Sequence, residues 1–342
     1  MPPVSEVIAV VSQPFLDFPR RRRVSGDGQL REAFDLFRLE KQGALRSPAT
    51  LDFYDLHLGK FFAWLELRCP EVGRFADLDA DILRRFRAEL AASPARYGRQ
   101  LQPESLHASH RALRVFLRWA ELEGHPVDPR MLRLPAPRVP KKEMTVFHAA
   151  QLRRLLEACN SPVEDLALRI LVGSGVRMSE LYSLALRGPD GLPDLMIDSL
   201  DRGYAELRVR WDAAKGGRAR RVPVTPQLAA AIKRYTSKHR PASESPALLL
   251  NRSGRPFLKG GVEATMNRLE KRVGFRVHAH AFRHTFATVA TQMGWNFERL
   301  RSAMGHADYS VLQRYVRLAS DRDLGSLREW QEFIVPDPSL RR

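Results

Sequence analysis

The sequence contains few cysteines, no long apolar run and comparatively few acidic residues. Only Cys69 and Cys159 occur among 342 residues, without a Cys-x-x-Cys spacing, which argues against a disulfide framework and against a thiolate metal site. No apolar stretch approaches the ~20 residues of a membrane-spanning helix. The N-terminus lacks the charged, apolar and cleavage regions of a secretory signal. We therefore expect a cytoplasmic protein that does not contact a membrane.

Basic residues are in clear excess. Fifty-six Lys and Arg stand against 39 Asp and Glu, so the formal net charge is +17. The parts of the chain before and after Lys142 are both basic. Such an excess favours a polyanionic partner, above all nucleic acid. A solvated basic surface without a ligand is the alternative, and charge alone does not separate the two.

Composition and periodicity divide the chain into an arm, two domains, a linker and a tail. Four prolines and the run Arg20–Arg23 indicate a flexible basic arm at the N-terminus. Three prolines in Pro-Ala-Pro-Arg-Val-Pro-Lys-Lys cannot continue a helix, so this stretch predicts a basic linker. The expected segments are the arm at 1–28, a helical domain at 29–134, the linker at 135–142, a second domain at 143–330 and a tail at 331–342.

The first domain is predicted to be all-helical. Ser47-Pro48 is a helix start, a capping residue followed by proline in the first turn. Apolar residues then recur at spacings of three and four, which predicts one buried stripe. This stripe comprises Leu51, Tyr54, Leu58, Phe61, Phe62 and Leu65. Further helices are expected near 30–42, 79–92 and 105–123. We interpret the aromatic residues as core rather than as platforms for stacked bases.

The second domain is predicted to be mostly helical with one small β element. Residues 204–211 alternate, with Leu207, Val209 and Trp211 on one face, and residues 220–224 alternate again. Gly216-Gly217 supplies the turn of a hairpin with Lys215 at its tip. Helices are expected from Thr225-Pro226 and at 262–273, 279–293, 296–304 and 309–319. The fold class is therefore mainly α (α+β), and the stretch 188–201 has no assigned role.

Polar residues that could take part in catalysis lie in four separate segments. In Gly-Ser-Gly-Val-Arg-Met-Ser-Glu-Leu, Arg177 is expected at a helix start, where Glu180 can orient its guanidinium. Lys215 lies on the hairpin. His280 and Arg283 are three residues apart and share a helix face. His306 is followed nine residues later by Tyr315.

These motifs resemble the tyrosine recombinase, or phage integrase, family. The resemblance rests on GSGVRMSEL, the hairpin lysine, HAFRHTFAT and AMGHADYSVLQRY, which occur in that order across the second domain. Any one motif is common, whereas the ordered set is specific. The helical first domain is similar to the family's core-binding domain, more loosely.

The resemblance implies a site-specific DNA recombinase that works through a 3′-phosphotyrosine intermediate. Tyr315 would be the nucleophile and Lys215 the general acid for the leaving 5′-oxygen. Arg177, Arg283, His280 and His306 would bind the scissile phosphate, with Glu180 holding Arg177. No metal or organic cofactor is expected. The implied partner is double-stranded DNA in the nucleoid, bound by a homotetramer across two recombination sites, with a monomer or dimer away from DNA.

Several other residues are candidates for a chemical role or for contacts with DNA. Tyr309 is the rival nucleophile, but it follows His306 too closely for the family's spacing. His284 is expected to be structural, since it follows Arg283 directly and should point away from the face of His280. Phosphate contacts are predicted for the remaining basic residues of the hairpin and linker. They are Arg210, Arg218, Arg220, Arg221, Lys141 and Lys142.

Two alternative functions remain open from the sequence. A type IB topoisomerase has a similar residue set but relaxes supercoils as a monomer. A catalytically silent DNA-binding protein of the same fold would not require Tyr315 at its position.

A further alternative concerns the packing of residues 324–334, whose apolar stripe contains Leu327, Trp330 and Phe333. It packs either on its own domain or on a neighbouring subunit.

Overall fold

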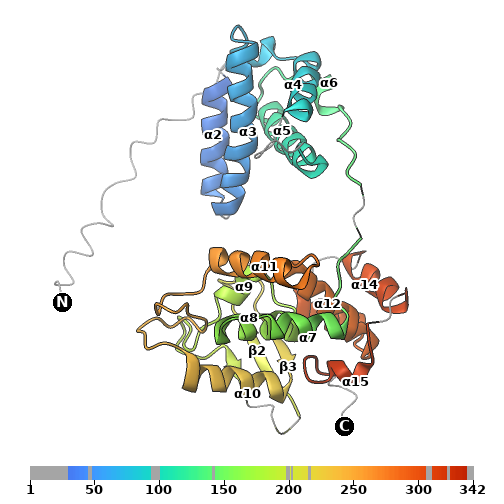
Figure 1. Cartoon of the computed structure of the whole chain (residues 1–342). Helices are drawn as coiled ribbons and strands as arrows, with labels where there is room; N and C mark the ends of the chain where they lie inside the picture. Colours follow the sequence, from blue (N-terminus) through green and yellow to red (C-terminus); the bar gives the residue numbers. More distant parts are fainter. Residues whose placement is uncertain are drawn as a thin grey trace, which may run out of the picture. The chain divides into compact units, whose positions relative to one another are not determined.

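The computed structural model describes residues 30–44, 48–93, 101–140, 143–197, 201, 203–214, 217–305, 310–321 and 324–336. The chain forms two compact units, Met1–Lys142 and Glu143–Arg342 (Figure 1). Several predictions fall outside the described residues. They concern the arm at 1–28, Lys141, Lys142, Lys215, His306 and Tyr309. Within the described ranges, every helix is too short or too polar to cross a bilayer.

The first unit consists of helices, and its expected elements are present. The helices are α2 (Leu30–Gly43), α3 (Pro48–Arg68), the short 3₁₀ helix η1 (Phe75–Asp77), α4 (Ala80–Ala92), α5 (Pro103–Leu122) and α6 (Pro129–Leu132). Pro48 is the first residue of α3, and Pro103 is the first residue of α5. Proline is tolerated in the first turn of a helix because the amides there have no hydrogen-bond partner within the helix. Asp79 caps α4 by accepting hydrogen bonds from the amides of Asp81 and Ile82.

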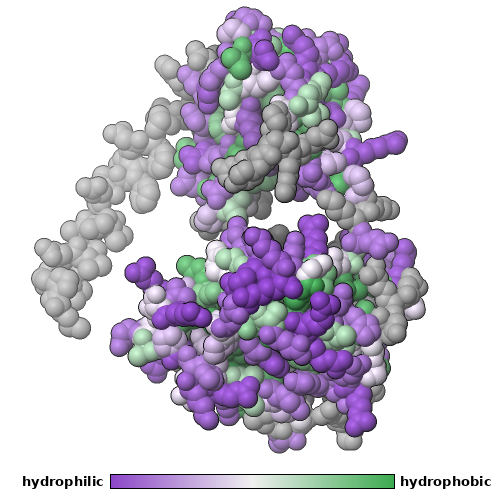
Figure 2. Space-filling model, in the orientation of Figure 1, coloured by the Kyte–Doolittle hydropathy of each residue, from purple (hydrophilic) through white to green (hydrophobic). Residues whose placement is uncertain are grey.

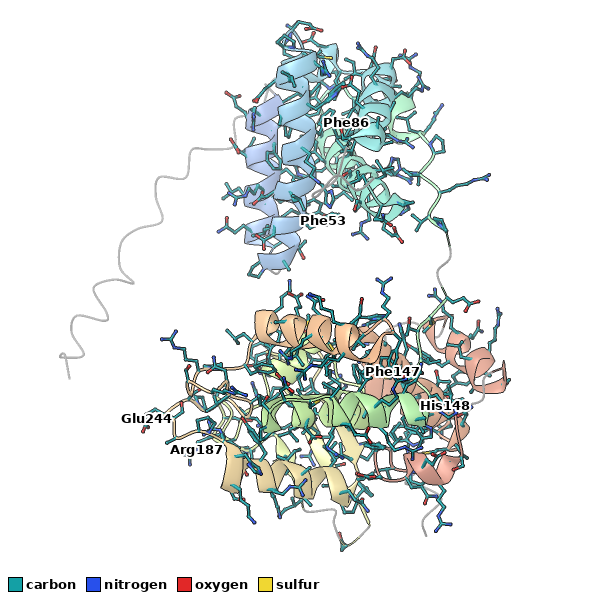
Figure 3. All side chains as sticks on the ribbon, viewed as in Figure 1. Phe53, Phe86, Phe147, His148, Arg187 and Glu244 are labelled. Atoms are coloured by element: carbon teal, nitrogen blue, oxygen red, sulfur yellow. The ribbon has the colours of Figure 1, made fainter. Side chains whose placement is uncertain are left out.

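Aromatic side chains fill the core of this unit. Phe37 contacts Tyr54, Phe116 and Trp119, with ring centroids 5.0 to 5.5 Å apart. Phe86 lies among the helices of the same unit (Figure 3). The prediction that these aromatics form a core is therefore confirmed.

The second unit surrounds a small sheet with helices. Its helices are α7 (Ala149–Glu157), α8 (Pro162–Ser174), α9 (Met178–Tyr182), α10 (Pro226–Arg234), the π-helical turn η4 (Tyr235–His239), α11 (Lys259–Val273), α12 (Ala279–Gln292), α13 (Phe297–Met304), α14 (Ser310–Asp321) and α15 (Leu327–Trp330). Phe147 lies in the core of this unit (Figure 3). Figure 2 shows that hydrophilic residues cover much of the visible surface of both units.

The sheet is antiparallel, with strand order β1 (Leu195–Met196), β2 (Ala205–Val209) and β3 (Arg220–Val224). Leu207 pairs with Val222, and both are buried. Leu207 and Val209 face the core, as their alternation predicts. The expectation for Trp211 is wrong: its side chain is 71% exposed. The strand ends at Val209, so the alternation of faces no longer applies two residues later.

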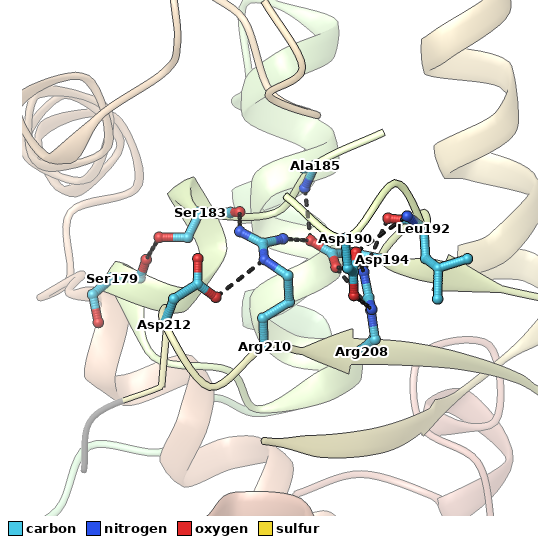
Figure 4. A network of polar contacts seen from close by, with 9 residues as sticks. All are labelled: Ser179, Ser183, Ala185, Asp190, Leu192, Asp194, Arg208, Arg210 and Asp212. Atoms are coloured by element: carbon cyan, nitrogen blue, oxygen red, sulfur yellow. Dashed lines mark hydrogen bonds and ion pairs between the residues drawn. The ribbon is translucent and has the colours of Figure 1, made fainter. Parts of the chain in front are cut away.

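The stretch 188–201 contains β1 and an ion-pair network (Figure 4). Asp194 is buried, forms ion pairs with Arg208 and Arg210, and accepts a hydrogen bond from the amide of Ala185. Arg210 also donates to the carbonyl of Ser183, 2.8 Å away, at the C-terminal end of α9. The network therefore ties the end of β2 to the helix that begins after Arg177.

The C-terminal segment packs on its own unit. Trp330 is fully buried, and its Nε1 donates to the carbonyl of Leu324 at 2.9 Å. Val335 accepts a hydrogen bond from Trp295 Nε1, and the carbonyl of Glu332 accepts one from Thr225. Phe333 and Ile334 therefore belong to the core of the second unit. In this single chain, residues 324–335 pack on their own domain, the first of the two alternatives.

We expect Trp330→Ala to lower the free energy of unfolding by about 3–5 kcal/mol, because it empties a closed site in the core. The matched control is Leu327→Ala on the same short helix, where the side chain is 41% exposed. That change should cost within about 0.5 kcal/mol. Urea unfolding of both variants measures the difference. Equal stability of the two variants would contradict the packing described here.

Candidate active site

Arg177 occupies the N-cap of α9, directly after the C-terminal end of α8. Its side chain is one-fifth exposed and donates from Nη1 to Glu180 Oε1 at 2.9 Å. The backbone amide of Arg177 donates to Glu180 Oε2 at 2.7 Å. The two contacts fix the guanidinium at the helix start, as the Arg–Glu spacing predicts.

Glu180 also binds a second arginine. Arg220, from the first position of β3, donates two parallel hydrogen bonds to the carboxylate at 3.0 and 2.6 Å. The Glu180 carboxylate is fully buried, and burial alone would raise its pKa. The hydrogen bonds and positive charges of Arg220 and Arg177 outweigh this effect and lower the pKa of Glu180 to about 2. Glu180 is therefore a permanent anion between two cations.

Arg283 lies on α12 and is 1% exposed. It donates from Nη1 to the carbonyl of Gly175 at 2.5 Å and from Nη2 to the carbonyl of Met304. Gly175 has φ +60°, and a Cβ there would lie 2.4 Å from the ring of Phe286, so only glycine fits. Burial, then repulsion from Arg177, lowers the pKa of Arg283 to about 9. The guanidinium stays charged at neutral pH.

Three consecutive carbonyls at the C-terminal end of α13 accept hydrogen bonds from the three arginines. Ala303 accepts from Arg220 Nε at 2.6 Å. Met304 accepts from Arg283, and Gly305 accepts from Arg177 Nη2 at 3.2 Å. The last carbonyls of a helix have no partner within it and lie at the negative end of its dipole. The end of α13 therefore gathers three cations that would otherwise repel one another.

Tyr315 comes from α14, which packs on α12. Its side chain is 1% exposed, and its hydroxyl lies 3.1 Å from Nδ1 of His284. Burial raises the pKa of the phenol, while the positive charges of Arg283, Arg314 and Arg177 lower it. Two of the arginines bound by the end of α13 are thus close enough to Tyr315 to act on its charge.

Comparison with known proteins identifies the family. The model of the phage integrase family matches residues 145–322, which is more than half of the chain. The chain belongs to the phage integrase family. It is a tyrosine recombinase, a DNA-binding enzyme that breaks and rejoins strands in site-specific recombination.

Its relatives carry the same description. Tyrosine recombinase XerC of Alcanivorax borkumensis is 30% identical over 241 residues, covering 67% of this chain and 73% of its own. The XerC of Xanthomonas campestris pv. campestris is 28% identical over 278 residues, covering 80% and 79%. Tyrosine recombinase XerA of Thermococcus kodakarensis is 27% identical over 314 residues, covering 90% and 96%.

Solved structures share the fold. The lambda integrase dimer bound to a COC′ core site superimposes with a TM-score of 0.65 at 14% identity, covering 94% of this chain and 86% of that one. The XerH site-specific recombinase bound to palindromic difH, in a post-cleavage complex, gives 0.61 at 17% identity, covering 85% and 82%. Both agree with the mainly helical architecture and small sheet expected from the sequence.

The recombinase brings part of the predicted site together. Arg177, Glu180, Arg283 and Tyr315 gather around the junction of α9, α12, α13 and α14. His280 lies on the exposed side of α12, one turn before His284. Lys215 and His306 lie outside the described residues, so their predicted places stay predictions.

Two of the predicted phosphate contacts are corrected. Arg220 is buried against Glu180 and Ala303, and Arg210 is bound to Asp194, Asp212 and the carbonyl of Ser183. Both guanidiniums are thus paired with a buried carboxylate that balances their charge. Arg283 is as buried, but its hydrogen bonds go to carbonyls, which leave its positive charge unbalanced. The sequence shows that the hairpin is rich in arginine, but it does not show which of these arginines are paired. The acidic partners of Arg210 and Arg220 lie up to 40 residues away in the chain. Arg218 and Arg221 are exposed, and Arg221 forms an ion pair with Glu206, so their phosphate contacts stay predictions.

The expectation for His284 is also wrong. His284 does not point away from His280: the two rings contact each other at 4.6 Å, edge to face. Residues four apart lie on one side of a helix, so the spacing of His280 and His284 already contained this signal. The contact between His284 and Tyr315 was not foreseeable, because it depends on how α14 packs on α12.

We expect Glu180→Gln to change the pH dependence of stability. The folded pKa of Glu180 is about 2, against 4.5 for a free glutamate. The low folded pKa means that the Glu180 carboxylate contributes about 3 kcal/mol to the free energy of unfolding. This contribution is present above pH 4.5 and is lost as the pH falls toward 2. Chemical unfolding between pH 2 and pH 7 should show that wild type loses about 3 kcal/mol more than the variant, because the other carboxylates titrate in both proteins.

The control for this experiment is Glu298→Gln. Glu298 forms an exposed ion pair with Arg301 one turn away on α13, and such pairs contribute under about 1 kcal/mol. Its pH profile should follow wild type. A Glu180→Gln profile parallel to wild type would show that the buried carboxylate contributes nothing in this range.

Proposed function

We propose that this tyrosine recombinase cleaves DNA by attack of the Tyr315 hydroxyl on a phosphodiester held by Arg177 and Arg283. The products would be a 3′-phosphotyrosine and a free 5′-hydroxyl. The covalent link would conserve the energy of the broken bond, so that rejoining needs no ATP. Charge on the non-bridging oxygens would be neutralised by guanidiniums, so we propose that no metal or organic cofactor takes part.

The observation that carries this proposal is the shared anchoring of Arg177 and Arg283 beside Tyr315. Both bind consecutive carbonyls at the end of α13, and both act on the charge of the phenol. The group of three arginines and one carboxylate holds an excess of positive charge. Binding of an anionic phosphate relieves the repulsion between the guanidiniums. The site is thereby preorganised for the charge that develops in the transition state.

The remaining roles rest on the motifs of the sequence. Lys215 would protonate the leaving 5′-oxygen, and its place on the β2–β3 connection suits a residue that arrives with the substrate. His280 and His306 would add donors to the phosphate. Glu180 would hold Arg177, which agrees with its contacts in the structure.

We propose that the enzyme acts as a homotetramer on two duplexes. The helical unit before residue 142 would serve as the core-binding domain, with the basic arm and the linker lysines, Lys141 and Lys142, along the DNA. Arg218 and Arg221, exposed near the hairpin, are the hairpin residues we retain as phosphate contacts. Binding would weaken as salt rises, because phosphate contacts release counterions.

The test of the nucleophile is Tyr315→Phe, which removes one oxygen. Covalent trapping with fragmented genomic DNA of the host, followed by sequencing of the attached fragments, yields the target sequence. On a nicked duplex of that sequence, Tyr315→Phe should retain DNA affinity and form no covalent adduct. Tyr309→Phe is the matched control and should form adducts as wild type does. Adducts from Tyr315→Phe would refute the assignment.

Arg177→Lys tests the bidentate role of the arginine. A lysine keeps the charge but cannot supply two parallel donors to a phosphate while also reaching Glu180. We expect adduct formation to slow by about 10²–10³-fold with little change in DNA affinity. Rates measured under single-turnover conditions on the nicked duplex check this. A rate within a few-fold of wild type would contradict the proposed contact.

A further inference from the structure

The contact between Tyr315 and His284 places a base beside the nucleophile. The Tyr315 hydroxyl and His284 Nδ1 are 3.1 Å apart, within range for a proton transfer. Their rings are 5.8 Å apart, with the tyrosine buried and the histidine partly buried. α12 presents His284, and α14 presents Tyr315. The sequence alone predicts a structural role for this histidine.

A phenol needs such a partner in order to attack phosphorus. Neutral phenol is a poor nucleophile, and burial raises the pKa of Tyr315, which disfavours its free ionisation. Arg283, Arg314 and Arg177 stabilise the phenolate but stay protonated, so none of them can take the proton. An imidazole with an unprotonated Nδ1 can do so.

We infer that His284 is a catalytic residue that accepts the phenolic proton of Tyr315 during strand cleavage. The inference rests on the proposed role of Tyr315 as nucleophile. A bond forms between the tyrosine oxygen and phosphorus as the bond from phosphorus to the 5′-oxygen breaks. The phenolic proton passes to His284 Nδ1, and the leaving oxygen receives the electron pair and a proton from the general acid. Rejoining reverses each transfer, and His284 returns the proton to the tyrosine.

His280 is the neighbouring candidate, and its position favours a different role. Its ring contacts His284 edge to face and lies on the exposed side of α12, whereas the ring of His284 is partly buried with Nδ1 3.1 Å from the hydroxyl. Within the part of the chain that the structure describes, the titratable and charged groups around the phenol include His284, His280 and Arg283 on α12, Arg314 on α14 and Arg177 before α9. His284 is in hydrogen-bond contact with the reacting oxygen.

Chemical rescue tests this role. On the nicked duplex recovered by trapping, His284→Ala should form the covalent adduct about 10²–10⁴-fold more slowly than wild type. Added imidazole should raise the rate of adduct formation by the variant. Because only unprotonated imidazole can accept the proton, this acceleration should disappear well below pH 6.5. His284→Gln keeps a hydrogen-bonding side chain without a base and should be as slow as the alanine variant.

The control is His239→Ala, which removes an exposed imidazole from η4. It should react at the wild-type rate and show no response to imidazole. Thermal unfolding and DNA affinity of each variant establish that it is folded and bound. No acceleration by imidazole in a folded, DNA-bound His284→Ala protein would overturn the inference, and so would a wild-type rate in His284→Gln. Adducts from Tyr315→Phe would instead overturn the proposed function itself.

Discussion

The catalytic unit depends on the attraction between the C-terminal end of α13 and three arginines from different parts of the chain. Arg177, Arg220 and Arg283 come from a helix start, a strand and a helix interior, and each donates to one of three successive carbonyls. Bringing three cations together costs electrostatic free energy. Glu180 offsets part of that cost, and the negative end of the helix dipole offsets more. In the proposed function, the charge that remains is the part that binds the phosphate.

The same interaction explains why the site contains an enclosed ion pair, Arg220 with Glu180, beside the partly exposed Arg177. Arg220 and Glu180 are enclosed by the protein, so their charges are used to hold other residues. Arg177 keeps one-fifth of its side chain exposed. The buried pair orients the outer arginine through Glu180. A basic residue near an active site therefore does not have to be a ligand for the substrate.

The sequence predicts the elements of the fold, and the wrong predictions about single residues share one cause. Helix starts at Pro48 and Thr225, the β2–β3 hairpin and the Arg177–Glu180 contact all depend on neighbours in the chain, so periodicity and capping rules predict them. The binding of Arg210 by Asp194, of Arg220 by Glu180 and of Tyr315 by His284 depends on how separate elements pack. No local pattern encodes those distances. Trp211 was misplaced because alternation does not show where a strand ends.

The packing of the last described residues has a consequence for biosynthesis. Residues 324–335 supply Trp330, Ile334 and Val335 to a core whose other members begin near Val146. Thr225 and Trp295 also have hydrogen-bond partners in this segment. A nascent chain therefore cannot close the second unit until almost all of it has left the ribosome, whereas the helices of the first unit have their partners much earlier. During synthesis the helical unit can be complete while the active site of the second unit is still unassembled, so strand cleavage has to wait until residues 324–335 have been made.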